Sequence, residues 1–401
     1  MFKLNHRVAA LRPSATMAAE ARATELKEAG ADVISLAAGE PDFDTPERIK
    51  EAARRALAAG LTKYTTVSGT TALKQAICLK LKRDNGLDYE PAQVMASAGA
   101  KQGAFNVIAT LFDDGDEVII PTPAWVSFAE MVRLSGAVPR LVRAPQEQGF
   151  RLTGGQLSGA ITSRTRGIII NSPCNPTGAV YREEHLRELS RVLAESGIWV
   201  LCDDVYEHMT YGGRAPHLFR IEPRLKEHGI VLNSLSKTYA MTGWRVGLLA
   251  GPREIIQAVA RLQGQNSGNP NSIAQAAAVE ALTGRQDEVA AMVSEFHKRR
   301  DFVVQRVRSL PGFSLPNVPE GAFYAFPQVK PLLSVKWKGA PLGDGDGVAR
   351  MLLDEAQVAV VGGNDFGAPE HVRISYATSM ANLEKAFDRM ETVARRMLGA
   401  A

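Results

Sequence analysis

Short apolar runs alternate with amphipathic stretches between about residue 46 and residue 290. The runs 167–171 (GIIIN) and 198–202 (IWVLC) are continuously apolar, as expected for strands that are buried on both faces. Intervening stretches repeat apolar residues with helical spacing. This alternation predicts an α/β fold, with a mostly parallel sheet covered by helices on both faces. The predicted strands are 94–98, 117–120, 138–142, 167–171, 198–203, 230–233 and 246–250, and the predicted helices are 101–112, 126–135, 182–196 and 254–262.

The pattern changes after about residue 290, where a long charged helix (288–310) leads into turn-rich sequence. Three short strands and a final helix follow, at 322–326, 358–361, 371–376 and 382–398. Residues 333–347, rich in Gly, Lys and Asp, are expected to form an exposed loop. We therefore predict a large domain over 45–290, and a smaller α+β domain formed by 291–401 with the N-terminal arm 1–44.

Composition and charge narrow the function without identifying it. A chain of 401 residues with 45% hydrophobic and 22% charged residues is of globular type and long enough for two domains. The net charge of +4 comes from 47 basic and 43 acidic residues that are well mixed, so no nucleic-acid or membrane partner is expected. The N-terminus lacks the apolar segment of a secretory signal. Cys78, Cys174 and Cys202 lack the spacing of metal ligands, which favours a cytoplasmic protein without a metal site.

Residues that follow the predicted strands are the first candidates for a site, because ligands bind outside the carboxyl ends of parallel strands. Gly99, Ala100 and Lys101 follow the first strand and open a helix, so their backbone N–H groups could bind a phosphate. A plain strand–helix turn is the alternative. Asn175 lies in the stretch SPCNPTG (172–178), where two prolines and a glycine would fix the direction of its amide or simply form a tight turn.

Two later strand ends carry charge. Asp203 and Asp204 end one strand, and a buried carboxylate there is costly unless it is paired; capping of the next segment would explain Asp204 but not both. The stretch SLSKTYAMTGWRVG (234–247) follows the next strand and holds Lys237 among small hydroxyl residues. Arg245 in the same stretch lies between apolar neighbours and therefore needs a buried anion.

One small molecule would use all of these groups together. A buried lysine such as Lys237 has a lowered pKa and can bond covalently to an aldehyde. A phosphate on that aldehyde would bind Ser234, Ser236, Arg245 and the N–H groups of residues 99–101. A pyridine nitrogen would pair with Asp203, and a ring hydroxyl with Asn175 and Tyr206. These features describe pyridoxal 5′-phosphate, which withdraws electrons from the Cα of amino acids.

The chain resembles the aspartate aminotransferase family, the class I aminotransferases among the fold-type I pyridoxal-phosphate enzymes, and is most similar to its bacterial branch. The resemblance extends through nearly the whole chain, and the order and spacing of its motifs make it specific. The motifs are LAAGEPDFDTP (36–46), KYTTVSG (63–69), SAGAKQ (97–102), PAWVSF (123–128), NSPCNPTGAVY (171–181), DDVYEHM (203–209), SLSKTYAMTGWRVG (234–247), EGAFYAF (320–326) and VRISYA (372–377).

The resemblance implies roles for individual residues at the cofactor. Lys237 resembles the lysine that holds the cofactor and moves the proton at the substrate Cα, and Asp203 the aspartate that keeps the pyridine nitrogen protonated. Tyr206 is expected beside them as a catalytic residue. Trp125 resembles the aromatic residue stacked on the cofactor ring. Tyr64 resembles a tyrosine that reaches the phosphate of the neighbouring subunit, which implies a homodimer.

Other residues are implied at the substrate. Arg373 resembles the arginine that binds the α-carboxylate through two hydrogen bonds, and Gly39 a backbone contact to the same group, with Trp125 and Asn175 also bordering the substrate. Selectivity then depends on cations near the substrate side chain. Lys101 and Arg12 (in LRPSAT, 11–16) are the candidates, each with an ordinary surface position as the alternative. If both face the substrate, aspartate or glutamate with 2-oxoglutarate or oxaloacetate is expected, and prephenate as a second substrate.

Other activities on the same scaffold stay open at this point. An aromatic or broad-specificity aminotransferase, a C–S lyase or a cyclase would share every cofactor residue. A pyridoxal-phosphate-binding regulator would need an additional DNA-binding domain, for which the chain has no spare residues. Cys174 occupies a loop position where a more polar residue is expected; a reactive thiol is the less favoured interpretation.

Overall fold

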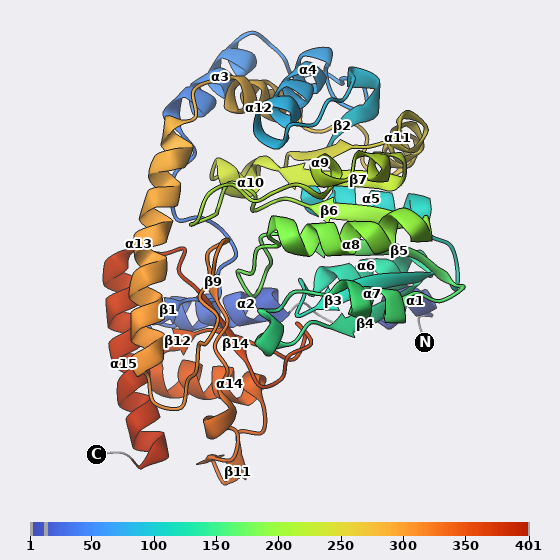
Figure 1. Ribbon diagram of the computed structural model, residues 1–401. Helices are drawn as coiled ribbons and strands as arrows, with labels where there is room; N and C mark the ends of the chain where they lie inside the picture. Colours follow the sequence, from blue (N-terminus) through green and yellow to red (C-terminus); the bar gives the residue numbers. More distant parts are fainter. Residues whose placement is uncertain (1–2, 12–14, 400–401) are drawn as a thin grey trace.

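The computed structural model describes residues 3–11 and 15–399, and its largest element is a seven-stranded sheet (Figure 1). The strand order is β2-β8-β7-β6-β5-β3-β4, and all seven predicted strands belong to it. Only β8 runs antiparallel to its neighbours, β2 and β7. The prediction of a mostly parallel sheet in an α/β fold is therefore confirmed. The strands are β2 (Val94–Ser97), β3 (Glu117–Thr122), β4 (Val138–Arg143), β5 (Thr165–Asn171), β6 (Trp199–Asp203), β7 (Gly229–Ser234) and β8 (Gly247–Ala250).

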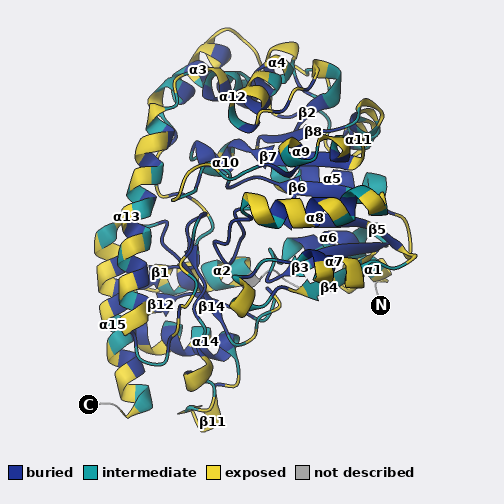
Figure 2. Ribbon diagram, viewed as in Figure 1, coloured by how far each residue is buried: buried dark blue, intermediate teal, exposed yellow. Residues whose placement is uncertain are grey.

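Helices cover both faces of this sheet, as Figure 2 shows by the buried strands between half-exposed helices. Ile168 and Ile170 point to one hydrophobic core, and Ile169 between them points to another. The first core includes residues of α4 (Thr71–Lys80), α8 (Glu183–Ser196) and α12 (Ser272–Thr283). The second includes residues of α5 (Ala100–Leu111), α6 (Ser127–Ser135) and α11 (Arg253–Asn266). Burial on both faces explains why the central strands β5 and β6 read as continuous apolar runs, whereas the edge strand β4 has no buried residue.

Local sequence sets the ends of these helices. Thr70 begins α4, because its hydroxyl accepts a hydrogen bond from the N–H of Leu73 (3.2 Å). Gly197 ends α8 in the left-handed conformation (φ 65°) that glycine adopts without strain. The remaining helices of this part are α3 (Glu47–Ala58), α7 (Gly154–Ala160), α9 (Leu218–Ile221) and α10 (Leu235–Thr238).

A separate core lies beside the sheet and is built mainly from the C-terminal part of the chain. It contains α13 (Asp287–Ser309), α14 (Gly345–Ala356) and α15 (Met380–Leu398) around a small sheet of order β13-β14-β9. N-terminal residues complete it, since β1 pairs in parallel with β12. The strands are β1 (Ile34–Ser35), β9 (Tyr324–Ala325), β12 (Val358–Ala359), β13 (Val361–Gly362) and β14 (Val372–Ser375), and two N-terminal helices are α1 (His6–Ala9) and α2 (Ala15–Glu28).

The prediction of an exposed loop over residues 333–347 is partly wrong. Residues 336–337 pair with residues 340–341 as a short hairpin of β10 (Lys336–Trp337) and β11 (Ala340–Pro341). Asp344 then begins helix α14, because its carboxylate accepts a hydrogen bond from the N–H of Gly347 (2.8 Å). The glycines and acids that suggested a loop are therefore, in part, the start of a helix.

We propose the predicted domain division, 45–290 against 1–44 with 291–401, as the best description of these cores. Ile34 and Leu36 pack with C-terminal residues, which supports grouping the N-terminal arm with them. Helix α13 runs along both parts (Figure 1): Val289 packs in a core of the large sheet, and Val303 packs in the C-terminal core. No helix in the described part of the chain is long and apolar enough to cross a membrane.

Candidate active site

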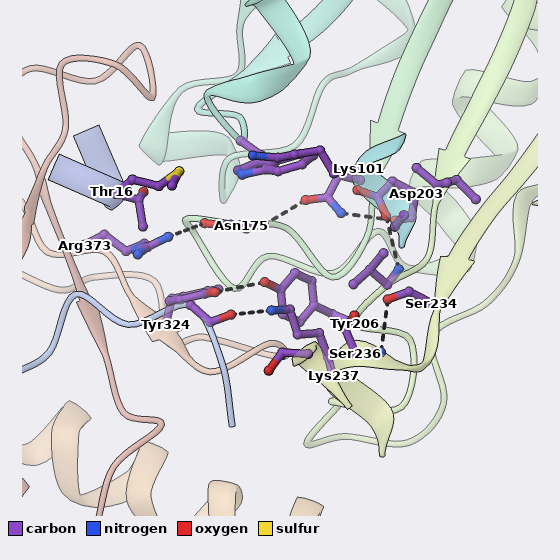
Figure 3. Close-up of a pocket in the computed structure, with 18 of the residues that line it drawn as sticks. Thr16, Lys101, Asn175, Asp203, Tyr206, Ser234, Ser236, Lys237, Tyr324 and Arg373 are labelled. Atoms are coloured by element: carbon purple, nitrogen blue, oxygen red, sulfur yellow. Dashed lines mark hydrogen bonds between the residues drawn. The ribbon is translucent and has the colours of Figure 1, made fainter. Parts of the chain in front are cut away.

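A cavity of about 310 Å³ lies where the carboxyl ends of β5, β6 and β7 approach the C-terminal core (Figure 3). Most of the residues singled out from the sequence line it. These are Gly39, Ala100, Lys101, Trp125, Asn175, Asp203, Tyr206, Ser234, Ser236, Lys237, Arg245 and Arg373. Thr16, Met17, Asn171, Val205, Leu232, Thr242 and Tyr324 line it as well. Residues from 16 to 373 are thus brought to one place.

One end of the cavity gathers groups that could bind an anion, and we call it the anion-binding cup. Gly99 has φ +85°, and a side chain there would put its Cβ 2.3 Å from Nη2 of Arg245. The absence of a side chain lets the guanidinium approach the start of α5, whose N–H groups are unpaired in the first turn. Arg245 donates to the backbone oxygen of Thr242 (2.8 Å) and has no carboxylate partner among the described residues. Ser234 and Ser236 border the same end, with Ser236 N–H donating to Ser234 Oγ (3.3 Å).

Lys237 lies at the centre of the cavity on the short helix α10. Its Nζ donates a hydrogen bond to the backbone oxygen of Gly39. Burial lowers the pKa of Lys237 to about 8, although Glu40 acts in the opposite direction. About a tenth of the amine is therefore neutral, and nucleophilic, at pH 7, far more than for an ordinary lysine.

Asp203 ends β6 and is buried beside the cavity. Burial raises the pKa of its carboxyl to about 7, and the nearby Asp204 adds to this effect. Val205 N–H donates to Asp203 Oδ1 (3.2 Å), which favours the ionised form but does not outweigh burial. A carboxyl group in this state needs a cationic partner to ionise fully.

Two asparagines connect the end of β5 with the rest of the site. Asn171 Nδ2 donates to the backbone oxygen of Asp203 (3.1 Å), and its Oδ1 accepts from the N–H of Asn175 (2.9 Å). Asn175 Oδ1 accepts in turn from Nη1 of Arg373 (3.0 Å). The amide direction of Asn175 is therefore fixed, as its flanking prolines suggested. Asn171 itself was not singled out from the sequence, because a strand-end asparagine has no distinctive pattern.

Arg373, on β14, is the cation at the opposite end of the cavity, and its exposed fraction is only 1%. Its Nη2 donates to the backbone oxygen of Ala37 (2.6 Å), so both of its hydrogen-bond acceptors among the described residues are neutral oxygens. Nε is buried without a hydrogen-bond partner among the described residues. Burial lowers the pKa of this guanidinium. A buried arginine without a carboxylate calls for an anionic ligand.

Tyr324 joins the two ends and was missed as a site residue. Its hydroxyl lies 2.9 Å from that of Tyr206 (Figure 3), and its ring lies 4.4 Å from the Arg373 guanidinium carbon. Burial raises the pKa of Tyr206 well above the usual tyrosine value. The motif EGAFYAF (320–326) carried the resemblance, and a single hydroxyl within that apolar strand was the available signal.

Lys101 and Trp125 line the cavity together. Lys101 Nζ lies 5.1 Å from the centre of the Trp125 ring, a distance suited to a cation–π contact. Burial and the neighbouring Arg245 lower the pKa of Lys101. No acidic side chain in the described ranges pairs with this lysine. Lys101 is exposed to solvent and also lines the cavity, so it is a second cation there without an acidic partner.

The other candidates stand apart from this lining or outside the described residues, and Gly99 borders it only through its contact with Arg245. Tyr64 is 98% exposed on the surface of the single chain. Arg12 lies outside the described residues. Cys174 is buried, with Sγ 3.6 Å from the backbone oxygen of Pro123, and burial raises the pKa of its thiol. A raised pKa disfavours the reactive thiolate.

A possible metal group lies outside the cavity. Within the described residues, Asp84, Glu207 and His208 offer ligand atoms within 4.8 Å of one another. Lys80 Nζ contacts Glu207 in the same place, however, and already supplies a positive charge there.

Comparison with known proteins agrees with this geometry. Residues 31–390 match the family described as aminotransferase class I and II. The aspartate aminotransferase of Geobacillus stearothermophilus is 46% identical over 391 residues, covering 97% of this chain and 98% of that protein. The aspartate/prephenate aminotransferase of Cereibacter sphaeroides is 47% identical over 396 residues, covering 98% of each chain.

Solved structures give the same result. The aspartate aminotransferase of Rhizobium meliloti superposes with a TM-score of 0.95 at 44% identity, over 99% of this chain and 100% of that one. The Thermus thermophilus aspartate aminotransferase with maleate gives a TM-score of 0.91 at 43% identity, over 98% and 100%. The match extends through both cores and every motif that lines the cavity. This chain therefore belongs to the class I and II aminotransferases.

Proposed function

We propose that this aminotransferase uses pyridoxal 5′-phosphate to exchange the amino group of aspartate or glutamate with 2-oxoglutarate or oxaloacetate. The observation that carries the choice of substrate is a pair of cations on one cavity. Arg373 and Lys101 both line it, and neither has a carboxylate partner among the described residues. A substrate with two carboxylates would satisfy both.

The donor set of the cavity fits the cofactor. Arg245, Ser234, Ser236 and the first N–H groups of α5 are suited to a phosphate, and the close approach of Arg245 to Gly99 supports this assignment. Asp203 is suited to a protonated pyridine nitrogen, which would supply the cation that its raised pKa calls for. The cofactor would provide an electron sink for charge that develops at the substrate Cα.

The protein's own groups would then bind, orient and move protons. Arg373 would hold the α-carboxylate, and Asn175 and Tyr324 would fix the guanidinium in place. Lys237 Nζ would carry the proton to and from the substrate Cα, for which its pKa of about 8 is well matched to neutral pH. Tyr206 would donate its hydroxyl hydrogen bond to the cofactor, because burial keeps this hydroxyl protonated.

Steady-state kinetics of Lys101→Ala test the substrate choice. A charged hydrogen bond contributes about 1.5–3 kcal/mol, so kcat/KM for aspartate should fall roughly 10- to 100-fold while that for phenylalanine or alanine barely changes. Lys82→Ala is the control, because Lys82 is an exposed lysine paired with Asp88 (3.0 Å). A wild type that prefers phenylalanine or alanine would indicate an aromatic or broad-specificity aminotransferase. Release of ammonia without an acceptor acid would indicate a lyase.

Prephenate is proposed as a second substrate, since curated relatives are named aspartate/prephenate aminotransferases. Prephenate also carries two carboxylates, so the same two cations could bind it. Arg12 was predicted to assist. Replacement of Arg12 by glutamine should then reduce turnover of prephenate more than turnover of aspartate.

A homodimer is proposed from Tyr64. The nearly complete exposure of this ring, with Leu57 and Leu61 also exposed nearby, supports a surface covered by a second copy. Sedimentation should give a dimer at assay concentration, and Tyr64→Phe should weaken retention of the cofactor. A fully active monomer would contradict the proposal.

The cytoplasm is proposed as the location. Cys78, Cys174 and Cys202 are free thiols, which supports a reducing compartment.

A further inference from the structure

A buried ion pair lies behind the anion-binding cup and has no part in the function proposed so far. Lys80, the last residue of α4, is only 3% exposed. Its Nζ contacts Glu207 Oε1 and donates to Asn85 Oδ1 (2.7 Å). A buried lysine and a buried glutamate are costly to remove from water and contribute little net stability as a pair. Their presence therefore needs another reason.

Glu207 accepts hydrogen bonds from three different segments. Lys80 ends α4, Asn85 ends the π-helical segment Leu81–Asn85 that follows it, and Asn233 belongs to β7. Asn233 Nδ2 donates to Glu207 Oε1 (2.7 Å), and Asn85 Nδ2 donates to Oε2 (2.5 Å). Both carboxylate oxygens are thus occupied. Burial alone would raise the pKa of Glu207, but Lys80 and His208 lower it, so the group is ionised.

Asn233 connects Glu207 to the anion-binding cup. Its Oδ1 accepts from the N–H of Ser234 (2.7 Å), and Ser234 Oγ accepts from the N–H of Ser236. An amide can present either its oxygen or its nitrogen in a given direction. The carboxylate of Glu207 requires the nitrogen on its own side, which leaves the oxygen for Ser234. The orientation of the Asn233 amide is therefore set by a hydrogen-bond acceptor outside the cavity.

Glu207 itself belongs to the turn that follows Asp203 and contains Tyr206. Its N–H donates to the backbone oxygen of Asp204 (2.9 Å) within that turn. One side chain thus links the turn after β6 to the corner after β7, and these two segments provide Asp203, Ser234 and Lys237 to the cavity.

We propose that Glu207, held by Lys80, is a positioning residue that sets the geometry of the anion-binding cup through the Asn233 amide. This inference rests on the proposed cofactor. Glu207 touches neither substrate nor cofactor, and its effect passes through the backbone of residues 233–237. The Lys80 ammonium keeps the carboxylate ionised and fixed, so that the cup is formed before any ligand arrives.

Two measurements on the cofactor-free protein test the proposal. Tryptophan fluorescence, which includes Trp125 in the cavity, gives the Kd for pyridoxal 5′-phosphate, and hydrogen exchange reports the amides of 233–237. Glu207→Ala should raise the Kd about tenfold or more, because a buried charged hydrogen bond is lost, and should speed exchange in 233–237. Unchanged Kd and exchange would overturn the proposal.

Further variants separate positioning from a general loss of stability. Lys80→Met combined with Glu207→Gln removes both charges but keeps an acceptor for Asn233, so the Kd should stay within about threefold of wild type. Glu288→Ala is the control, because Glu288 pairs with Arg48 (3.2 Å) away from the cavity and should leave the Kd unchanged. A Kd raised equally in all three proteins would contradict the proposal.

A double-mutant cycle tests the route through Asn233. Asn233→Ala should resemble Glu207→Ala, and the double variant should bind no more than about twofold more weakly than either. Additive losses would show that Glu207 does not act through Asn233. If wild type itself failed to bind the cofactor, the proposed function would be wrong, whereas the exchange measurement would still decide whether Glu207 orders residues 233–237.

Discussion

The two ends of the cavity are built in different ways. The anion-binding cup takes Gly99, Ser234 and Arg245 from turns next to β2, β7 and β8, which are adjacent strands of one sheet. The opposite end takes Arg373 and Tyr324 from the small sheet of the C-terminal core. Hydrogen bonds within one sheet fix the first end, whereas the second depends on how two cores pack.

Few hydrogen bonds join these ends directly. Arg373 bonds Asn175 across the cavity, Lys237 bonds the backbone of Gly39, and the hydroxyls of Tyr206 and Tyr324 lie 2.9 Å apart. The cofactor end is thus a rigid frame, and the substrate end is brought to it by a small number of contacts. Changes at the first end should affect cofactor binding or chemistry, and changes at the second should affect substrate binding.

Replacement of Lys237 should have the largest effect on activity, because this residue is needed at both ends of the cavity. Lys237→Ala should reduce turnover below detection, since the other lysine that lines the cavity among the described residues, Lys101, lies against the Trp125 ring. The visible absorbance of the enzyme should no longer change when an amino acid is added. Lys101→Ala is the control and should retain that change. Near-wild-type turnover by Lys237→Ala would show that the cofactor assignment is wrong.

Asp203→Ala should separate chemistry from cofactor retention at the first end. An ion pair at about 4 Å in an effective dielectric near 20 is worth roughly 4 kcal/mol, so kcat should fall about 10³-fold. The cofactor should remain bound through its phosphate in the anion-binding cup. Stopped-flow kinetics and a cofactor Kd on the same variant check both statements. Equal losses in rate and affinity would instead point to a structural role of this carboxylate.

Arg373→Lys should affect only the second end. Lysine cannot reproduce the planar fork of arginine, so KM for every amino acid should rise roughly 10- to 100-fold while the cofactor Kd is unchanged. Lys101→Ala provides the contrast, because its effect should be confined to dicarboxylic substrates. If Arg373→Lys weakened the cofactor as well, the two ends would be coupled more tightly than proposed.

The smallest expected effect is on the pH dependence of stability. The folded cofactor-free chain holds the Asp203 proton up to about pH 7, whereas the unfolded chain releases it near pH 4. The free energy of unfolding should therefore fall as pH rises, by roughly 2 kcal/mol between pH 5 and pH 7. Asp203→Asn lacks this titration, so urea unfolding of the two proteins should diverge over that range. Parallel curves would show that the carboxyl of Asp203 is ionised in the folded protein.

The large sheet was predictable because burial on both faces leaves a strong signal. Short apolar runs predicted all seven strands, two of them (167–171 and 198–202) continuously apolar, and turn residues after them predicted the cup. The resemblance then supplied Arg373, which lies in the other core and which spacing alone could not bring to the cavity.

The sequence signals for other parts of the structure are weaker. Helix α14 was missed because its first turn is rich in glycine, and only the contact between Asp344 and Gly347 shows that the segment is helical. Tyr324 contacts Tyr206, and Asn171 contacts Asp203, across long separations in sequence, so their roles depend on packing. The link from Lys80 through Glu207 to Asn233 spans 153 positions and carries no local pattern.

The unpaired cations of the cavity have a practical consequence for anyone who handles the protein. Arg245, Arg373 and Lys101 lack carboxylate partners in the described structure, so small anions in the buffer will occupy them. Phosphate or citrate should raise the apparent melting temperature of the cofactor-free chain and slow its reconstitution by competition. A melting temperature measured for this protein is therefore, in part, a property of its buffer.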